Sequence, residues 1–248
     1  MRTDYEQLAD RYDEDRARFT VEADDIVVAL GETTGPGPRR VLDVGCGTGT
    51  WLWAHAELVV GADVCLIGAD PSAAMLEQAR RKGLSNLVRC GAEALPFVTG
   101  SVDYAVANFT FHHWEKEQAL REVTRVLTPR GVFRLTNVEP GSVGGWWLYD
   151  FFPEAAALDE QRFWSSDRIA NELDHLGFHV QVYRDVGQEE EPIGQALADA
   201  ERRVVSQLAA LDDEVYFRGL TKLRDAAKNP EITVTNSRAL LRLTASRR

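Results

Sequence analysis

A short strand that runs straight into a loop with glycine at every second position is the strongest constraint on this chain. Residues 41–50, VLDVGCGTGT, begin with strand-forming side chains and continue through Gly45, Gly47 and Gly49. Glycine tolerates positive φ angles and has no Cβ, so a ligand can approach the backbone of such a loop closely. A tight turn that packs only against its own chain is the other interpretation of this pattern.

Apolar runs alternate with helical stretches on both sides of the loop. Strands are predicted at residues 40–44, 64–70, 86–90, 102–109 and 131–138, and helices at residues 48–58, 72–82 and 115–127. This alternation predicts an α/β fold with a doubly wound, mostly parallel, Rossmann-like sheet. Ligands of such sheets bind outside the carboxyl ends of the strands, near the switch in strand order. The glycine loop is expected at that place.

The flanking segments are expected to complete the fold. Residues 4–29 predict one or two helices, and a Gly/Pro linker follows them. Beyond the core, residues 141–164 are rich in aromatic side chains and have no clear period. We then expect a helix at 165–176, a strand at 178–186, helices at 193–211 and 213–228, and a last strand at 239–245, antiparallel to 178–186. The sheet would have seven strands, with helical and aromatic insertions.

Composition narrows the class of partner. The formal net charge of −11 opposes binding to a phosphate backbone, so nucleic acid is not the expected partner. Three cysteines at wide spacing indicate neither a disulfide framework nor a metal site. The charged N-terminus has no signal-peptide core, and no segment has the ~20 apolar residues of a membrane span. We therefore expect a cytoplasmic protein that does not bind membranes.

Loop spacing and one carboxylate predict the kind of ligand. A dinucleotide fingerprint that starts at Gly45 would need glycine where Thr50 stands, and the lysine of a phosphate-binding P-loop is missing. Asp70 ends the second predicted strand, where a carboxylate can accept hydrogen bonds from both hydroxyls of a ribose. This favours a nucleoside ligand over a nicotinamide dinucleotide. Alternatively, Asp70 is simply an acidic residue favoured at a helix N-terminus.

Five segments, in order, carry a family resemblance: VLDVGCGTGT, GADPSAAMLEQAR, GAEALPF, SVDYAVANFTFHHW and EVTRVLTPRGVFRLTNV. Their spacing resembles that of class I S-adenosylmethionine-dependent methyltransferases, in particular the ubiquinone-biosynthesis-like, type 11 small-molecule group. The resemblance extends over about residues 5–183. It implies S-adenosylmethionine as cofactor and S-adenosylhomocysteine as product. It also implies one domain over residues 1–248, with a lid and linker at 1–38, a cofactor-binding core at 39–138, and substrate-side insertions and closing strands at 139–248.

The resemblance assigns roles to residues of this chain. The cofactor residues that it implies are Tyr5, Tyr12, Asp43, Gly45, Cys46, Gly47, Gly49, Asp70, Pro71, Met75, Ala92, Glu93, Asn108 and Phe109. Asp43 and the glycine loop would surround the methionine half, Asp70 would hold the ribose, and Met75 would flank the adenine. Tyr5 and Tyr12 would belong to the lid. The family often has aspartate where Gly91 stands, so either Glu93 or the backbone is expected to bind the adenine amino group.

Two histidines are the candidates for catalysis. Methyl transfer from a sulfonium is an in-line displacement, so the protein mainly has to align the acceptor and exclude water. A hydroxyl or protonated amine acceptor also needs a base, and His112 and His113 follow the fourth predicted strand closely. Alternatively, one histidine makes a local hydrogen bond near the helix that starts at Glu115, and the other is simply exposed.

An aromatic cluster is the candidate substrate pocket. Trp146, Trp147, Tyr149 and Phe152 would supply a large apolar contact area for a small-molecule acceptor. Packing within an insertion explains the same residues equally well. A protein that binds the cofactor without methylating, as a regulator or a cyclase, also remains open. The oligomeric state, monomer or homodimer, is not predicted.

Overall fold

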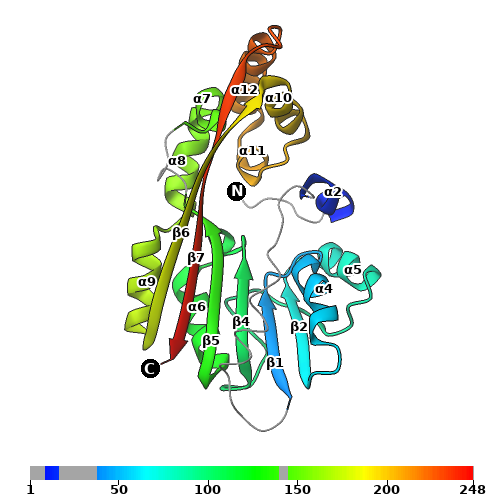
Figure 1. Ribbon diagram of the computed structural model, residues 1–248, viewed down its shortest axis with the longest axis vertical. Coiled ribbons are helices and arrows are strands. Elements are labelled where there is room, and N and C mark those ends of the chain that lie inside the picture. Colours follow the sequence, from blue (N-terminus) through cyan, green and yellow to red (C-terminus); the bar gives the residue numbers. More distant parts are fainter. Residues whose placement is uncertain (1–8, 17–37, 140–144, 248) are drawn as a thin grey trace. The chain divides into compact units, whose positions relative to one another are not determined.

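The computed structural model describes residues 9–16, 38–139 and 145–247, and these form two compact units (Figure 1). The core unit comprises Asp4–Asn137, Ser166–Tyr183 and Arg242–Arg248, and the helical unit comprises Val138–Ser165 and Arg184–Leu241. Each unit is described by itself. The expectation of a single domain therefore stays a prediction.

The core unit is built on a sheet whose seven strands are β1 Arg39–Val44, β2 Val64–Asp70, β3 Leu87–Arg89, β4 Val102–Asn108, β5 Leu127–Val138, β6 Phe178–Pro192 and β7 Thr233–Arg247. Their order in the sheet is β3-β2-β1-β4-β5-β7-β6. β1 to β5 pair in parallel, and β7 runs in the opposite direction (Figure 1). The prediction of a mostly parallel seven-stranded sheet is confirmed.

The strand order reverses between β1 and β4. From β1 the chain continues outward to β2 and β3 on one side, and then returns to β4 and β5 on the other. This switch point leaves a crevice outside the carboxyl ends of β1 and β4, where ligands of doubly wound sheets bind. The glycine loop follows β1 at this switch point, as the sequence predicts.

Helices and short 3-10 turns connect the strands of the core unit. They are η1 Ala9–Arg11, α2 Tyr12–Arg16, α4 Thr50–Ala56, η2 Glu57–Val59, α5 Ala73–Arg81, η3 Phe111–His113, α6 Lys116–Val126 and α9 Ser166–His175. The helices predicted at residues 48–58, 72–82, 115–127 and 165–176 all form, and their ends differ from the expected ones by at most two residues. Of the helical segment predicted at 4–29, η1 and α2 are described, and residues 4–8 and 17–29 lie outside the described residues. At α5 the N-cap is Ser72, whose Oγ accepts a hydrogen bond of 3.2 Å from the Met75 N–H.

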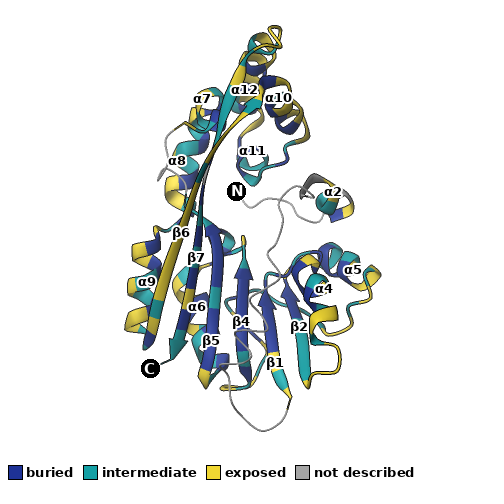
Figure 2. Cartoon of the chain, viewed as in Figure 1, coloured by how far each residue is buried: buried dark blue, intermediate teal, exposed yellow. Residues whose placement is uncertain are grey.

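Apolar side chains hold α4 and α5 against one face of the sheet. Trp51 and Leu52 from α4 and Leu76 from α5 pack on Val41 of β1 and Tyr104 of β4. All five side chains are buried, and the central strands β1, β4 and β5 are mostly dark blue in Figure 2. A truncation such as Leu52→Ala in this core costs about 2–5 kcal/mol of unfolding free energy. The sheet is therefore a firm base for the loops at its carboxyl edge.

The helical unit contains α7 Trp147–Phe151, α8 Pro153–Arg162, α10 Ile193–Arg202, α11 Ser206–Ala210 and α12 Asp213–Ala226. The expectation of one helix over residues 193–211 is wrong, because α10 ends at Arg202 and its C-cap Arg203 has a left-handed backbone with φ 49°. There the guanidinium of Arg203 lies 3.7 Å from the ring centre of Tyr216 on α12. This cation–π contact favours the turn that separates α10 from α11.

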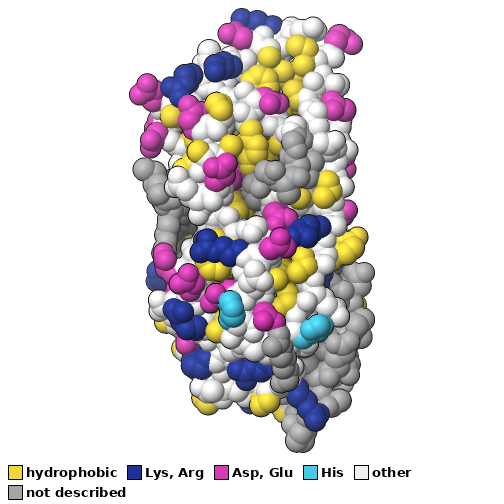
Figure 3. All heavy atoms as spheres, turned by 90° about the vertical axis from the view of Figure 1, so that its left-hand side faces the viewer, with side chains coloured by type: hydrophobic (Ala, Val, Ile, Leu, Met, Phe, Trp, Pro, Cys, Tyr) yellow, Lys and Arg dark blue, Asp and Glu magenta, His cyan; other side chains and the backbone are white. Residues whose placement is uncertain are grey.

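The long strands β6 and β7 contribute to both units, since the boundary between the units falls within each of them. On the face drawn in Figure 3, lysine and arginine side chains alternate with aspartate and glutamate rather than forming one basic stripe. Within the described residues, no helix has the length and apolar character needed to cross a bilayer.

Candidate functional site

The three loop glycines have different reasons to be glycine. All have positive φ angles, 77° at Gly45, 54° at Gly47 and 73° at Gly49. At Gly45 and Gly49 a Cβ would collide with side chains of this chain, those of Thr110 and Leu84 respectively. At Gly47 a Cβ would meet nothing within 4 Å. Packing therefore accounts for the outer two glycines, whereas Gly47 borders open space that a ligand can fill.

Asp70 braces this loop from the end of β2. Its Oδ2 accepts the Gly47 N–H at 2.9 Å, and its Oδ1 accepts the Ser72 N–H at 2.8 Å. The Asp70 side chain is 8% exposed. A carboxylate has about four acceptor positions, so bracing the loop is compatible with accepting ribose hydroxyls as well. The loop and the carboxylate therefore meet at the carboxyl edge, as the sequence predicts.

Asp43 lies beside this pair near the end of β1. Its side chain is 2% exposed, and burial, followed by the nearby charge of Asp70, raises the pKa of Asp43 to about 8. In the empty site the carboxyl is therefore mostly protonated at neutral pH. A positively charged ligand group next to Asp43 would lower this pKa and favour the carboxylate.

Other residues implied for the cofactor differ in what they can offer. The side chain of Cys46 packs in the core, and a Cβ on Gly68 would lie 2.8 Å from its Sγ. Cys46 can therefore offer only its backbone to a ligand at the glycine loop. Met75 and Ala92 are buried, with 2% and 5% exposure, whereas Pro71 is exposed. Their contacts with an adenine stay predictions.

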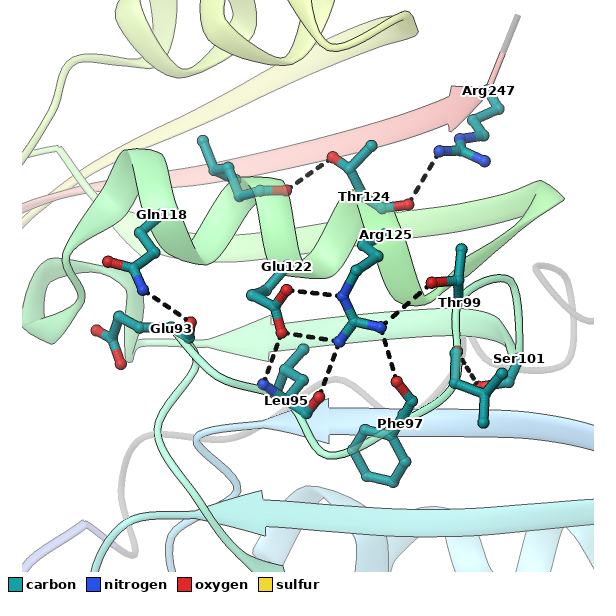
Figure 4. A network of polar contacts seen from close by, with 12 residues as sticks. Glu93, Leu95, Phe97, Thr99, Ser101, Gln118, Glu122, Thr124, Arg125 and Arg247 are labelled. Carbon is teal, nitrogen blue, oxygen red and sulfur yellow. Dashed lines mark hydrogen bonds and ion pairs between the residues drawn. The ribbon is translucent and has the colours of Figure 1, made fainter.

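Glu93 occupies the space next to Gly91. Its Oε1 accepts the Glu115 N–H at 2.8 Å, and a Cβ on residue 91 would lie 2.6 Å from its Oε2. The backbone oxygen of Glu93 accepts a hydrogen bond of 3.1 Å from Gln118 Nε2 of α6 (Figure 4). Glu93 is thus fixed in place by the start of α6.

A charged pair on α6 holds the following segment. Arg125 donates to the backbone oxygens of Leu95 and Phe97, each at 2.8 Å, and to the carboxylate of Glu122 (Figure 4). Glu122 in turn accepts the Leu95 N–H at 2.8 Å. Hydrogen bonding to Arg125 lowers the pKa of Glu122. Residues 93–97 are therefore attached to α6 at several points.

The end of β4 has a strained backbone. Phe109 has a φ of 52°, which is unusual for a bulky residue, and its side chain is 36% exposed. Its N–H donates to the Thr136 oxygen of β5 at 2.8 Å. Asn108, the residue before it, has a buried Nδ2 without a hydrogen-bond partner. Such strain concentrates at ligand sites.

The two histidines lie in the next turn. η3 contains both, with ring centres 3.9 Å apart. His112 is 9% exposed, and His113 is partly buried. The His113 N–H donates to the Thr110 oxygen at 2.9 Å, and the hydroxyl of Thr110 occupies the space next to Gly45. The turn is therefore close to the glycine loop, and catalysis by either histidine stays a prediction.

The N-terminal segment contacts the glycine loop through residues that the sequence reasoning missed. Asp13 of α2 accepts the Thr48 hydroxyl at 2.6 Å and forms an ion pair of 2.6 Å with Lys82. Asp10 accepts a hydrogen bond of 2.6 Å from Gln78 of α5. Tyr12 is partly buried in α2, whereas Tyr5 lies outside the described residues. No local sequence signal predicts these contacts, because they join positions far apart in the chain.

The candidate substrate aromatics all belong to the helical unit. Trp147 and Phe152, with 2% and 0% exposure, are part of its hydrophobic core, and Trp146 and Tyr149 pack against that core. The Tyr149 hydroxyl donates to Asp159 Oδ2 at 2.8 Å. These residues have packing roles within the unit, and contact with a substrate stays a prediction.

No group of three side chains suited to a metal ion occurs in the part of the chain that is described.

Comparison with known proteins shows a likeness to methyltransferases. Residues 41–131 match the model of a methyltransferase domain. A malonyl-acyl-carrier-protein O-methyltransferase of Legionella pneumophila is 35% identical over 156 residues, which are 60% of this chain and 48% of that protein. The matched region contains the glycine loop, Asp70, Glu93 and both histidines.

Two further proteins show the extent of the likeness. A demethylmenaquinone methyltransferase of Thermus thermophilus is 37% identical over 117 residues, 45% of this chain and 52% of that protein. A crystal structure of a putative methyltransferase from an antibiotic biosynthesis pathway of Anabaena variabilis superposes with a TM-score of 0.65 at 20% identity, covering 89% of this chain and 97% of that one. The chain spans about half the length of these two curated relatives.

Proposed function

We propose that this chain binds S-adenosylmethionine at the carboxyl edge of β1, β2 and β4 and transfers its methyl group to a small-molecule acceptor, with S-adenosylhomocysteine as product. One observation carries the proposal: Gly47 borders open space at positive φ, and its N–H is bound by the strand-end carboxylate of Asp70. A bare loop beside a carboxylate fits a nucleoside whose ribose hydroxyls donate hydrogen bonds.

The described residues divide the binding task by charge. Asp43 is buried and mostly protonated when the site is empty, so it suits the ammonium group of the methionine half, which would favour its carboxylate. Asp70 suits the ribose, and Glu93 presents Oε2 to the remaining end of the ligand. The bound cofactor supplies a methyl group on a positively charged sulfur. No nucleophilic side chain is needed, because the displacement needs no covalent intermediate with the protein.

The chain then has to hold the acceptor and accept its proton. His112 and His113 follow β4 in η3, and a neutral imidazole there is a suitable base for a hydroxyl or a protonated amine. Phe109, exposed and strained at the end of β4, supplies an apolar contact. Exclusion of water would keep the acceptor in line with the methyl group.

The identity of the acceptor is proposed only as a class. The two curated relatives act, by their names, on malonyl-acyl-carrier protein and on demethylmenaquinone. The acidic composition of this chain agrees with a small molecule, and we place the protein in the cytoplasm without a nucleic-acid or membrane partner. Whether it acts as a monomer or a homodimer is left open.

Titration calorimetry with S-adenosylhomocysteine tests the binding site. Asp70→Ala should weaken binding by about 10²-fold or more, because two ribose hydroxyls lose a charged acceptor. Asp63→Ala is the matched control, since Asp63 is exposed just before the opposite end of β2. Equal affinities of the folded Asp70→Ala variant and the control would place the cofactor elsewhere.

Release of S-adenosylhomocysteine during incubation with small-molecule acceptors tests the reaction. Sustained release of product with an acceptor supports a methyltransferase. Tight binding of the cofactor together with an acceptor that is converted without product release would instead support the use of the cofactor as a structural element.

A further inference from the structure

A completely buried amide at the end of β5 has no hydrogen-bond partner. Asn137 is 0% exposed, and neither its Nδ2 nor its Oδ1 has a partner in the structure. More than nine in ten buried polar groups in folded proteins are paired, and an unpaired one costs free energy of folding. The described chain therefore supplies no hydrogen-bond partner to the side-chain amide of Asn137.

Asn137 lies at the same edge of the sheet as the candidate site. Asn108 of β4 pairs with Thr136 of β5, so Asn137 is one residue beyond this pair. The Phe109 N–H is bound to the Thr136 oxygen at 2.8 Å, which fastens the strained turn after β4 to the end of β5. Asn108 and Thr136 are paired across β4 and β5. Phe109, with its strained backbone, and Asn137, with its unpaired amide, are the residues that come directly after this pair.

Strand alternation separates Asn137 from the residues implied for the methionine half. Asp43 pairs with Val106, and Asn108, two residues further along β4, shares that face of the sheet. Asn137 comes directly after Thr136, the partner of Asn108, and so belongs to the opposite face, together with Leu135 and Phe133. Its missing partner is therefore distinct from the group held by Asp43.

We propose that Asn137 binds the methyl acceptor through a hydroxyl group of that acceptor. The inference rests on the proposed function and narrows its substrate class. Oδ1 needs a donor and Nδ2 needs an acceptor, and a hydroxyl meets both needs with a single oxygen. A carboxylate only accepts and an ammonium only donates, so each would leave half of the amide unpaired.

Thermal unfolding tests whether the unpaired amide of Asn137 lowers the stability of the folded protein. Asn137→Leu replaces an unpaired polar side chain by an apolar one of similar volume, so its Tm should rise by roughly 2–4 °C. Asn86→Leu is the matched control, because Asn86 has a partner: its Nδ2 donates to the Leu66 oxygen at 3.2 Å. The Tm of this control should fall. A fall in Tm for Asn137→Leu as well would give the amide a structural role, such as holding an internal water, and overturn the proposal.

Ligand binding tests the hydroxyl. Benzyl alcohol and benzyl methyl ether differ in the O–H donor, and both are titrated by NMR into protein saturated with S-adenosylhomocysteine. The wild type should bind the alcohol about tenfold more tightly than the ether, because only the alcohol satisfies Oδ1. Asn137→Leu should lose this preference while its affinity for S-adenosylhomocysteine stays within about twofold.

Three results would count against the inference or its basis, and they can be told apart. Equal binding of the two probes by the wild type, or binding of neither, would overturn the hydroxyl assignment. A preference that survives in Asn137→Leu would show that another residue recognises the hydroxyl. Failure of the wild type to bind S-adenosylhomocysteine would instead overturn the proposed function, and the result for the Tm of Asn137→Leu would still stand.

Discussion

The carboxylate of Glu93 fills the space next to Gly91, where a Cβ would lie 2.6 Å from Oε2. An acidic side chain at residue 91 would therefore be crowded and repelled by Glu93. The structure explains the absence of the family's frequent aspartate here: a carboxylate is already present, supplied from two residues further along the chain and fixed by the Glu115 N–H.

We expect Glu93→Ala to weaken S-adenosylhomocysteine binding about tenfold, because the adenine amino group loses an acceptor. The double variant Gly91→Asp/Glu93→Ala should recover most of this loss. Calorimetry with the analogue that has a 6-oxo group instead of the 6-amino group is the control for specificity. If Glu93→Ala weakens the binding of both compounds equally, Glu93 only supports the start of α6.

We expect Gly47→Val to abolish measurable cofactor binding, because a branched side chain would occupy the open space next to the loop. A β-branched residue at positive φ also strains the backbone, so a control with the same strain is needed. Gly61→Val supplies it, since Gly61 has a φ of 81° and nothing within 4 Å of its Cβ position. If the two variants bind S-adenosylhomocysteine with comparable affinity, the glycine loop is only a turn and does not contact the cofactor.

Proton release should accompany cofactor binding at neutral pH. Burial, followed by the charge of Asp70, raises the pKa of Asp43 to about 8, and an ammonium next to it favours the carboxylate. Binding should therefore tighten as the pH rises towards 8, with up to about one proton released at pH 7. Calorimetry in buffers of different ionisation enthalpy measures the release, and Asp43→Asn should eliminate it. Proton uptake on binding would contradict this assignment.

The same pKa has a consequence for the empty protein. The pKa of Asp43 is higher in the folded chain than its ordinary value of 3.8. The contribution of this group to stability is therefore complete below pH 4 and is lost as the pH rises through about 8. Denaturant titrations across this range should show a smaller decline with pH for Asp43→Asn than for the wild type.

We expect Asp13→Ala and Lys82→Met to speed S-adenosylhomocysteine release about five- to tenfold. Asp13→Ala removes the hydrogen bond between α2 and Thr48 of the glycine loop, and both variants remove the ion pair that holds Asp13 in place. The control is Glu77→Gln, which removes exposed ion pairs with Arg80 and Arg81 on α5. Stopped-flow displacement measures the rate. Wild-type release from both test variants would mean that the contact serves only to attach the N-terminal segment.

We expect one of His112 and His113 to be the general base. Replacement of that histidine by alanine should lower kcat by about 10²–10⁴-fold with cofactor affinity nearly unchanged, because a general base acts on the acceptor proton. His175→Ala is the control, since His175 is exposed on α9. If both variants keep the wild-type kcat, positioning alone drives the reaction.

Local patterns were sufficient to predict β1 to β4 and the helices between them. These strands are short apolar runs, and Ser72 marks the start of α5 by an ordinary N-cap. β5, β6 and β7 are longer than the predicted ranges 131–138, 178–186 and 239–245, because the apolar runs mark only part of each strand. The meeting of Gly47 and Asp70 followed from strand-end geometry, which is common to doubly wound sheets. These features depend on neighbouring residues or on the topology of the fold, so the sequence contains them directly.

The helical unit and several contacts could not be predicted in this way. The aromatic segment has no period, because Trp147 and Phe152 pack in a core whose other members come from α10 and α12. The break at Arg203 depends on its contact with Tyr216, and the attachment of α2 depends on Lys82. The unpaired amide of Asn137 becomes visible only when every neighbouring polar atom has a position. Each of these features requires tertiary structure.

Because β6 and β7 each begin in one unit and end in the other, the gene cannot be cut between the units with a single break. A fragment that stops at Asn137 would lack both strands and leave the edge of β5 uncovered, a surface prone to aggregation. Replacement of the helical unit by that of a relative has to splice the chain inside both strands and also at the two ends of Val138–Ser165. Recombination of this protein is therefore an exchange of two insertions rather than of a module at one end.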